Sequence, residues 1–145
     1  FHSDIVGGVV ASLCEAYRVC TRFDDTGHHV DLLFDRETDA INVESNYTNK
    51  NFGVTLKQPG PLWIRIPSWA DGDWTNITAC ESRIVGEYLF ISEPPVGLPI
   101  RIPYELPQRS FTLQHRKRNI NVSLRGDSVD AMNSFGADLT FFDNI

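Results

Sequence analysis

The feature that most constrains the fold of this chain is a change of hydrophobic period near residue 27. Between Ser3 and Cys20, apolar residues recur at steps of three and four, which is the pattern of an amphipathic helix. After a turn at residues 24–27, apolar and polar residues alternate almost to the end of the chain, as is typical of β-strands. The sequence therefore predicts one helix followed by a β-rich region.

The expected helix carries one broad apolar stripe. Its members lie three or four residues apart and are Ile5, Val9, Leu13, Ala16 and Cys20. The pair Gly7-Gly8 destabilises such a helix by about 1 kcal/mol per glycine relative to alanine, a loss that close packing against a neighbour would offset. We therefore expect the stripe to pack on the β-rich region or on a partner chain.

The alternating part of the sequence predicts about eight short strands, typical of two packed antiparallel sheets. Segments 52–56, 62–66, 98–102 and 120–124 each place three apolar side chains on one face, and further strands are expected near residues 30–34, 41–45, 88–91, 111–114 and 139–142. We expect Ile64, Ile66, Ile100 and Val122 inside the core. Pro99 indicates a sheet edge, because proline lacks the amide hydrogen that a central strand donates.

The predicted fold class is therefore mainly β: an antiparallel β-sandwich preceded by one amphipathic α-helix. We expect two parts, a helix within residues 1–27 and a sandwich domain over residues 28–145. A chain of 145 residues is long enough for this, since it can remove roughly 70% of its extended surface from water.

Charge and hydropathy narrow the range of partners. The formal net charge of −6 repels phosphate backbones and anionic lipids, and the basic run at residues 115–118 lies between two expected strands, as a solvated turn does. No apolar run approaches the roughly 18 residues that a membrane span needs. We therefore expect neither nucleic acid nor membrane as a partner.

No set of residues in the sequence predicts a catalytic or metal site. Cys14 and Cys20 lie about 9 Å apart along the axis of the expected helix, and Cys80 lies in a different region. His28 and His29 are adjacent at the start of an expected strand, so their side chains point to opposite faces and cannot easily share one metal ion. We expect no catalytic residue, metal or cofactor in this chain.

The cysteines and the sequons give opposite indications of localisation. An odd count of three cysteines favours a reducing compartment. Three sequons, which begin at Asn46, Asn76 and Asn121, point weakly to secretion. The sequence therefore leaves localisation open.

The best binding candidate is the segment that holds all three tryptophans. Trp63, Arg65, Trp69 and Trp74 are the candidate residues, since exposed aromatic rings stack on the faces of sugars. With Leu62, Ile64 and Ile66 facing the core, Trp63 and Arg65 point to the opposite face. These side chains would then contact either carbohydrate or a neighbouring domain, and packing is the expected role.

A family resemblance rests on the same segment. Residues 64–69, Ile-Arg-Ile-Pro-Ser-Trp, resemble the Arg-Ile-Pro-x-Trp strand in the β-sandwich that follows the α/α barrel of β-L-arabinofuranosidase-like glycoside hydrolases. In the same order, residues 29–34 resemble the strand that leaves the barrel, residues 40–45 the next strand, and residues 86–89 a later Gly-Tyr strand. The resemblance departs from the family at residues 93–98, which keep only the glycine of a Trp-x-x-Gly-Asp turn.

The resemblance implies that the helix between Ser3 and Cys20 is the last helix of an upstream barrel. It also implies a zinc ion in the barrel of the parent protein, with a zinc-bound cysteine as nucleophile. The family's Cys-Cys pair before this helix occurs nowhere in this sequence. None of the family's catalytic residues can therefore be carried onto this chain.

The leading hypothesis is a non-catalytic, accessory β-sandwich of a glycoside hydrolase-like protein that acts on arabinofuranoside-type carbohydrates. Its partner would be the upstream α/α-barrel domain or another chain, bound through the Ser3 to Cys20 helix, with carbohydrate as a further candidate. The alternatives are a stand-alone carbohydrate-binding module that uses the tryptophan segment, and a non-enzymatic assembly domain.

Overall fold

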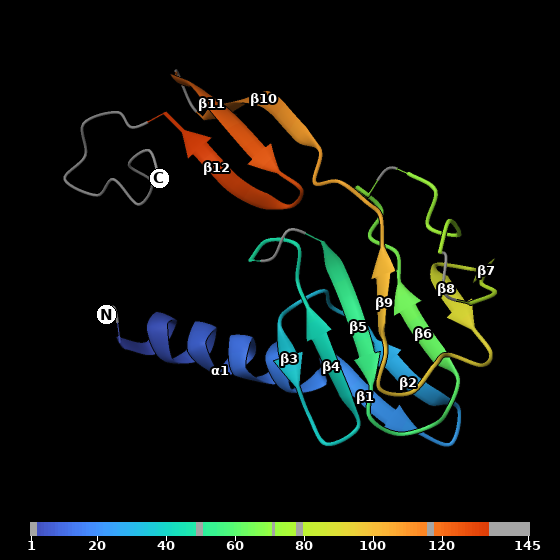
Figure 1. Cartoon of the computed structure of the whole chain (residues 1–145). Coiled ribbons are helices and arrows are strands. Elements are labelled where there is room, and N and C mark those ends of the chain that lie inside the picture. Colours follow the sequence, from blue (N-terminus) through green and yellow to red (C-terminus); the bar gives the residue numbers. More distant parts are fainter. Residues whose placement is uncertain (1–2, 49–50, 71, 78–79, 116–117, 134–145) are drawn as a thin grey trace. The chain divides into compact units, whose positions relative to one another are not determined.

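The computed structural model describes residues 3–48, 51–70, 72–77, 80–115 and 118–133, and begins with one helix, α1 (Ser3–Val19) (Figure 1). The helix predicted between Ser3 and Cys20 is thereby confirmed. Strands make up most of the described remainder, so the predicted mainly-β fold with one leading helix is confirmed as well. The strand expected near residues 139–142 lies outside the described residues.

The described strands form three sheets. The first has the order β1 (Thr21–Asp24), β2 (Gly27–Val30), β6 (Leu62–Arg65), β8 (Tyr88–Ile91) and β7 (Arg83–Val85). The second has the order β3 (Arg36–Glu37), β4 (Ile41–Glu44), β5 (Phe52–Leu56) and β9 (Pro99–Ile102). The third has the order β10 (Gln108–His115), β11 (Arg118–Arg125) and β12 (Ser128–Met132). Neighbouring strands are antiparallel except β2 and β6, which are parallel.

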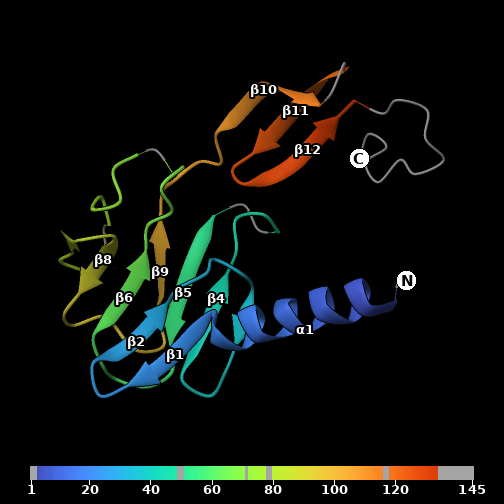
Figure 2. The ribbon, with the colours of Figure 1, turned by 180° about the vertical axis from the view of Figure 1, so that it is seen from behind.

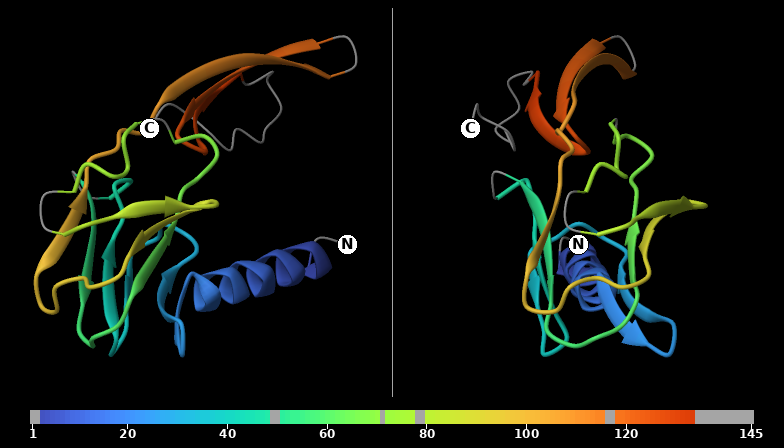
Figure 3. Two further views of the ribbon diagram at one scale, coloured as in Figure 1. Left: turned by 90° about the vertical axis from the view of Figure 1, so that its right-hand side faces the viewer. Right: turned by 45° about the vertical axis from the view of Figure 1, so that its right-hand side comes forward.

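These sheets divide between two compact units. The sandwich unit comprises residues 1–67 and 72–104, and the three-stranded unit comprises residues 68–71 and 105–145. Within the sandwich unit, the five-stranded and four-stranded sheets face each other (Figure 3). The division lies within the region of residues 28–145 that the sequence led us to treat as one sandwich domain.

The core of the sandwich unit follows from the period of two. Along β6, Leu62 and Ile64 are fully buried while Trp63 is half-buried and Arg65 exposed, because successive side chains point to opposite faces. The other fully buried apolar side chains of the two sheets are Val30, Val43, Phe52, Val54, Leu56, Leu89, Ile91, Ile100 and Ile102. Each sheet therefore presents one apolar face to the other, and burial of those faces stabilises the sandwich.

Three of the four residues predicted to lie inside are buried. Ile64 and Ile100 belong to the sandwich core, but Ile66 is only half-buried because β6 ends one residue before it. Val122 is 4% exposed and belongs to the three-stranded unit. The predicted edge position of Pro99 is confirmed, since β9 pairs with β5 alone among the described strands.

The middle of the apolar stripe of α1 does not pack on the sandwich, although Ala16 is half-buried and Cys20, just after the helix, is fully buried. The side chain of Ile5 lies outside the described residues. Val9 is 53% exposed and Leu13 64% exposed, so the first of the two expected outcomes is wrong for these residues. The helix is held at its carboxyl end instead, where the Arg36 guanidinium lies 4.6 Å from the centre of the Tyr17 ring. Figure 2 shows the helix running directly into β1. Packing of the stripe on a partner chain stays a prediction.

The three-stranded unit is a single amphipathic sheet. Register pairs Phe111 and Met132 with the central Val122, so all three lie on one face, and Leu113 lies two residues from Phe111 on that face. Phe111, Leu113 and Met132 are 42%, 48% and 37% exposed. The opposite face carries mainly hydroxyl and amide side chains. A bulge at Ser123 and Leu124 shifts the register between β11 and β12.

Candidate functional site

The three tryptophans lie in different surroundings. Trp63 lies on β6 and is half-buried on the outer face of the five-stranded sheet. Trp74 is 2% exposed and stacks on Tyr104 with ring centres 4.4 Å apart, so its ring has no free face for a ligand. Trp69 belongs to the three-stranded unit, where its carbonyl accepts a 2.8 Å hydrogen bond from Arg109. Of the four predicted site residues, the structure therefore keeps Trp63 and Arg65 together.

Trp63 is the centre of a row that crosses the whole five-stranded sheet. Register pairs it with His29 on β2 and with Phe90 on β8. His29 in turn pairs with Arg22 on β1, and Phe90 with Arg83 on β7. Paired residues point to the same face, so these five side chains form one continuous row, with an arginine at each end.

The members of this row contact one another along its length. The Arg22 guanidinium lies 2.9 Å from Nδ1 of His29, whose ring is parallel to Trp63 with centres 6.0 Å apart. Trp63 and Phe90 have ring centres 4.2 Å apart and are tilted by 41°. The Arg83 guanidinium lies 5.0 Å from the centre of Phe90. Cross-strand aromatic pairs and guanidinium–ring contacts of this kind each contribute about 0.5–1 kcal/mol.

The position of the Trp63 ring is set by the β1–β2 hairpin. Its Nε1–H donates a 3.1 Å hydrogen bond to the carbonyl of Thr26 in the turn. That turn is itself fixed by Asp24, whose Oδ1 accepts a 2.8 Å bond from the Thr26 amide. The indole is therefore held before any ligand arrives, which lowers the entropy lost on binding.

A second row of polar side chains runs beside the aromatic row on the same face. The Tyr88 hydroxyl donates a 3.0 Å hydrogen bond to Asp31, and Nε of Arg22 donates a 3.1 Å bond to the other oxygen of that carboxylate. Arg65 forms a 3.3 Å ion pair with Glu87, and its side chain is 50% exposed. Burial raises the pKa of Tyr88 and the Asp31 carboxylate adds to the effect, so the phenol stays protonated as a donor at neutral pH.

The charges on this face cancel. Three guanidiniums and three carboxylates belong to it: Arg22, Arg65, Arg83, Asp24, Asp31 and Glu87. Arg22 is paired with two of the carboxylates and Arg65 with the third. Arg83 has no ion pair within the described part of the chain. The face therefore has mixed donors and acceptors but no net charge.

The adjacent histidines point to opposite faces, as predicted. His28 is fully buried on the inner face, stacked on Phe23 with ring centres 4.1 Å apart, and its Nε2 lies 3.0 Å from the Gln58 carbonyl. His29 lies on the outer face in the row. Burial lowers the pKa of both rings, and for His29 the Arg22 charge lowers it further, so both are neutral at pH 7.

The thiols do not converge on a metal site. Cys14 is exposed on α1, while Cys20 is buried and its Sγ lies 3.0 Å from the carbonyl oxygen of Tyr17. Burial raises the pKa of Cys20 and Cys80, which disfavours the thiolate that a zinc ligand or nucleophile requires. Within the described residues, no three potential ligands of the His, Cys, Asp or Glu type gather. The donor set therefore does not fit the zinc-thiolate centre that the resemblance implies for a parent barrel.

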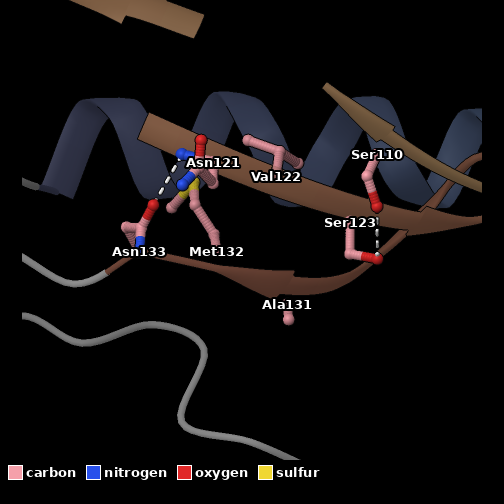
Figure 4. A pocket seen from close by; sticks show the side chains of 7 residues that line it. All are labelled: Ser110, Asn121, Val122, Ser123, Ala131, Met132 and Asn133. Atoms are coloured by element: carbon pink, nitrogen blue, oxygen red, sulfur yellow. Dashed lines mark hydrogen bonds between the residues drawn. The ribbon is translucent and has the colours of Figure 1, made fainter. Parts of the chain in front are cut away.

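A shallow hollow of about 280 Å³ lies on the three-stranded unit (Figure 4). It is lined by Ser110, Asn121, Val122, Ser123, Ala131, Met132 and Asn133. Several of its polar groups already have partners. The Ser110 and Ser123 hydroxyls lie 3.4 Å apart, and the backbone N–H of Asn121 donates a 2.6 Å hydrogen bond to Oδ1 of Asn133. The hollow contains no charged or nucleophilic pair that would carry out chemistry.

The sequence missed four members of the aromatic row. Arg22, His29, Phe90 and Arg83 lie on other segments of the chain, and two of their strands, β1 and β7, were not predicted. The signal that would have found His29 and Phe90 was alternation about Val30 and Leu89, which puts each on the face away from the core. The register that aligns them with Trp63 carries no local signal.

Comparison of the chain with protein-family models, with curated proteins and with solved structures gives no match. Among the described residues, no helix is long and apolar enough to cross a membrane. The structure itself is a β-sandwich with one leading helix, and the outer face of its five-stranded sheet is polar and aromatic.

Proposed function

We propose that this chain is a non-catalytic β-sandwich portion of a glycoside hydrolase-like protein that acts on arabinofuranoside-type carbohydrates. Its role is to support an α/α-barrel domain or another chain, which it contacts through α1. The single observation that carries the proposal is the exposed apolar face of α1, next to a sandwich whose own core is closed.

The helix needs a partner for physical reasons. Every position from Gly7 to Glu15 is exposed, and five large apolar or aromatic residues of α1 are 44–64% exposed: Val9, Val10, Leu13, Tyr17 and Val19. An isolated helix of 17 residues is marginal in water, more so with two adjacent glycines near its start. Burying these side chains would stabilise it by about 1 kcal/mol each, given that each is about half exposed now.

The choice of a helical barrel as partner rests on the sequence resemblance. Residues 64–69 and the segments around them follow the order found in the sandwich of β-L-arabinofuranosidase-like hydrolases, where a helix of the barrel leads into the sandwich. The order of one leading helix followed by strands supports this choice, although the strand assigned by resemblance to the barrel exit, at residues 29–34, overlaps the end of β2 and not β1. The carbohydrate class follows from the same resemblance.

The test is association in trans with an α/α-barrel domain of a β-L-arabinofuranosidase-like hydrolase that lacks its own last helix. Binding is measured by isothermal titration calorimetry for the unchanged chain, for Leu13→Asp and for Ala11→Asp. Leu13 lies within the apolar stripe and Ala11 on the opposite side of the helix, so both variants add one charge to an exposed position. We expect Leu13→Asp to weaken binding at least tenfold and Ala11→Asp to leave it unchanged.

Two outcomes contradict the proposal. The first is equal binding by the two variants, which would place the contact elsewhere. The second is a chain that binds no barrel and forms no oligomer in light scattering while circular dichroism still shows the helix. Self-association that Leu13→Asp abolishes would instead favour the assembly domain. In the same preparation, we expect no hydrolysis of p-nitrophenyl arabinofuranosides, with or without added zinc.

A further inference from the structure

We propose that the outer face of the five-stranded sheet binds a neutral oligosaccharide, with Trp63 at the centre of the site. The proposed function supplies only the choice of sugars to be tested. The site itself is inferred from the aromatic row and from the polar row beside it, which register brings together from five strands.

The aromatic part of the site supplies an apolar surface on the outer face of the sheet. Trp63, Tyr88 and Phe90 are each half-buried on the outer face, and the Arg83 guanidinium lies over the Phe90 ring. The 41° tilt between Trp63 and Phe90, and the edge-on approach of Tyr88 at 6.3 Å from Trp63, leave an uneven aromatic surface. The C–H face of a sugar ring packs against such surfaces, whose carbon atoms gain by leaving water.

The polar part of the site supplies partners for hydroxyl groups. Arg65 is half exposed and lies 3.3 Å from Glu87, so both charged groups are accessible to a ligand above the sheet. Asp31 accepts from Tyr88 and from Arg22, which fixes its carboxylate in place. Sugar hydroxyls donate and accept at once, and paired carboxylates and guanidiniums satisfy both functions.

Charge balance decides the class of ligand. Three guanidiniums and three carboxylates on the face leave no net field for an anionic polymer, and the whole chain carries a formal charge of −6. A polyanion would not gain the electrostatic attraction that a basic surface provides. A neutral, hydroxyl-rich ligand suffers no such penalty, and an extended oligosaccharide fits a row that spans the sheet.

The test is titration of the purified chain with neutral arabino-, xylo- and cello-oligosaccharides of three to six units, and with oligogalacturonate as the anionic comparison. Binding is followed by calorimetry and by ¹H–¹⁵N chemical-shift changes. We expect at least one neutral series to bind, with shifts confined to β1, β2, β6, β8 and β7 and the indole Nε1–H of Trp63. Oligogalacturonate is expected to bind at least tenfold more weakly.

The variants are chosen to separate loss of the site from loss of the fold. Trp63→Ala and Arg65→Ala should each weaken binding at least tenfold, while Trp69→Ala, in the other compact unit, should leave it unchanged. Because Trp63→Ala also removes ring contacts, Arg65→Ala serves as the second test: its side chain is half exposed and its loss spares the core. Circular dichroism confirms that each variant is folded.

The proposal is overturned if no neutral oligosaccharide binds at millimolar concentration, or if both site variants bind as the unchanged chain does. It is also overturned if shifts on titration with the barrel domain, and not with sugars, fall on this face, since the face would then be a domain contact. Its failure leaves the helix contact untouched, because that contact is measured separately with the Leu13→Asp and Ala11→Asp variants.

Discussion

Gly27 gives the sharpest test of the packing at the β1–β2 hairpin. Its φ of +111° is one that residues with a side chain rarely adopt, and a Cβ built there would lie 2.3 Å from the carbonyl oxygen of Pro61. That same oxygen accepts a 2.8 Å hydrogen bond from the amide of His28. A Gly27→Ala change therefore strains the backbone and pushes away the carbonyl that joins β2 to the start of β6.

The expected loss of stability is the sum of two effects. An alanine at positive φ costs about 1–2 kcal/mol. Moving the Pro61 carbonyl by the roughly 1 Å needed to relieve the overlap weakens its hydrogen bond with His28, which costs about a further 1 kcal/mol. Gly27→Ala should therefore lower the free energy of unfolding by about 2–3 kcal/mol. Gly86 provides the matched control, since its φ is +62° and nothing lies within 4 Å of the position that an added methyl group would take.

The assay is urea unfolding followed by tryptophan fluorescence and far-ultraviolet circular dichroism. Gly86→Ala should cost about 1 kcal/mol, so the two variants should differ by about 1–2 kcal/mol. At an m-value of about 2 kcal/mol/M, this is roughly 0.5–1 M in the urea midpoint. Equal midpoints for the two variants would refute the reasoning, because they would mean that the carbonyl of Pro61 does not confine position 27.

Two other predictions concern the same unit. Burial lowers the pKa of His28, so the unfolded chain binds the proton more tightly and the free energy of unfolding should fall as the pH drops below about 6.5. His28→Leu should reduce this pH dependence of the urea midpoint between pH 7.5 and 5.0. An unchanged pH dependence would contradict the prediction. Ile64→Ala should cost about 3–4 kcal/mol in urea unfolding and Ile66→Ala less than half of that, because Ile64 is fully buried and Ile66 half-buried; similar costs would show that Ile66 is as well packed as Ile64.

The strands that could be predicted from the sequence are those with an apolar face. Segments 52–56, 62–66, 98–102 and 120–124 all coincide with observed strands, because alternation records which side of a strand is buried. The strand expected at 30–34 was displaced, since β2 ends at Val30 and the following residues are irregular. The strand β2 was not recognised over residues 27–29 because its two buried histidines do not count as apolar residues in the alternating pattern.

The missed strands share a different property. β1, β3, β7 and β12 have few or no buried side chains, and β3 and β7 are only two and three residues long. Each lies at the edge of its sheet, where one neighbour suffices and the side chains stay in water. Such strands form through backbone hydrogen bonds to a neighbouring strand. Their own amino-acid pattern contains little information about this pairing.

The candidate site shows the same limit. Alternation along β6 correctly put Trp63 and Arg65 on the face away from the core. It could not separate Trp69 and Trp74 from them, because those two residues lie beyond the end of the strand, where the period of two no longer applies. Trp74 became part of the core through its contact with Tyr104, which lies far along the chain from it.

The two surfaces that we propose for binding differ in chemistry, and the difference matches their proposed partners. The stripe of α1 is apolar, which suits a permanent contact whose stability comes from excluding water. The outer face of the five-stranded sheet mixes half-buried rings with paired charges that stay hydrated in the free protein. A face of that kind can remain exposed without aggregating and still bind a ligand that brings its own hydroxyl groups. One contact would thus hold the module in place, and the other would be free to engage a sugar reversibly.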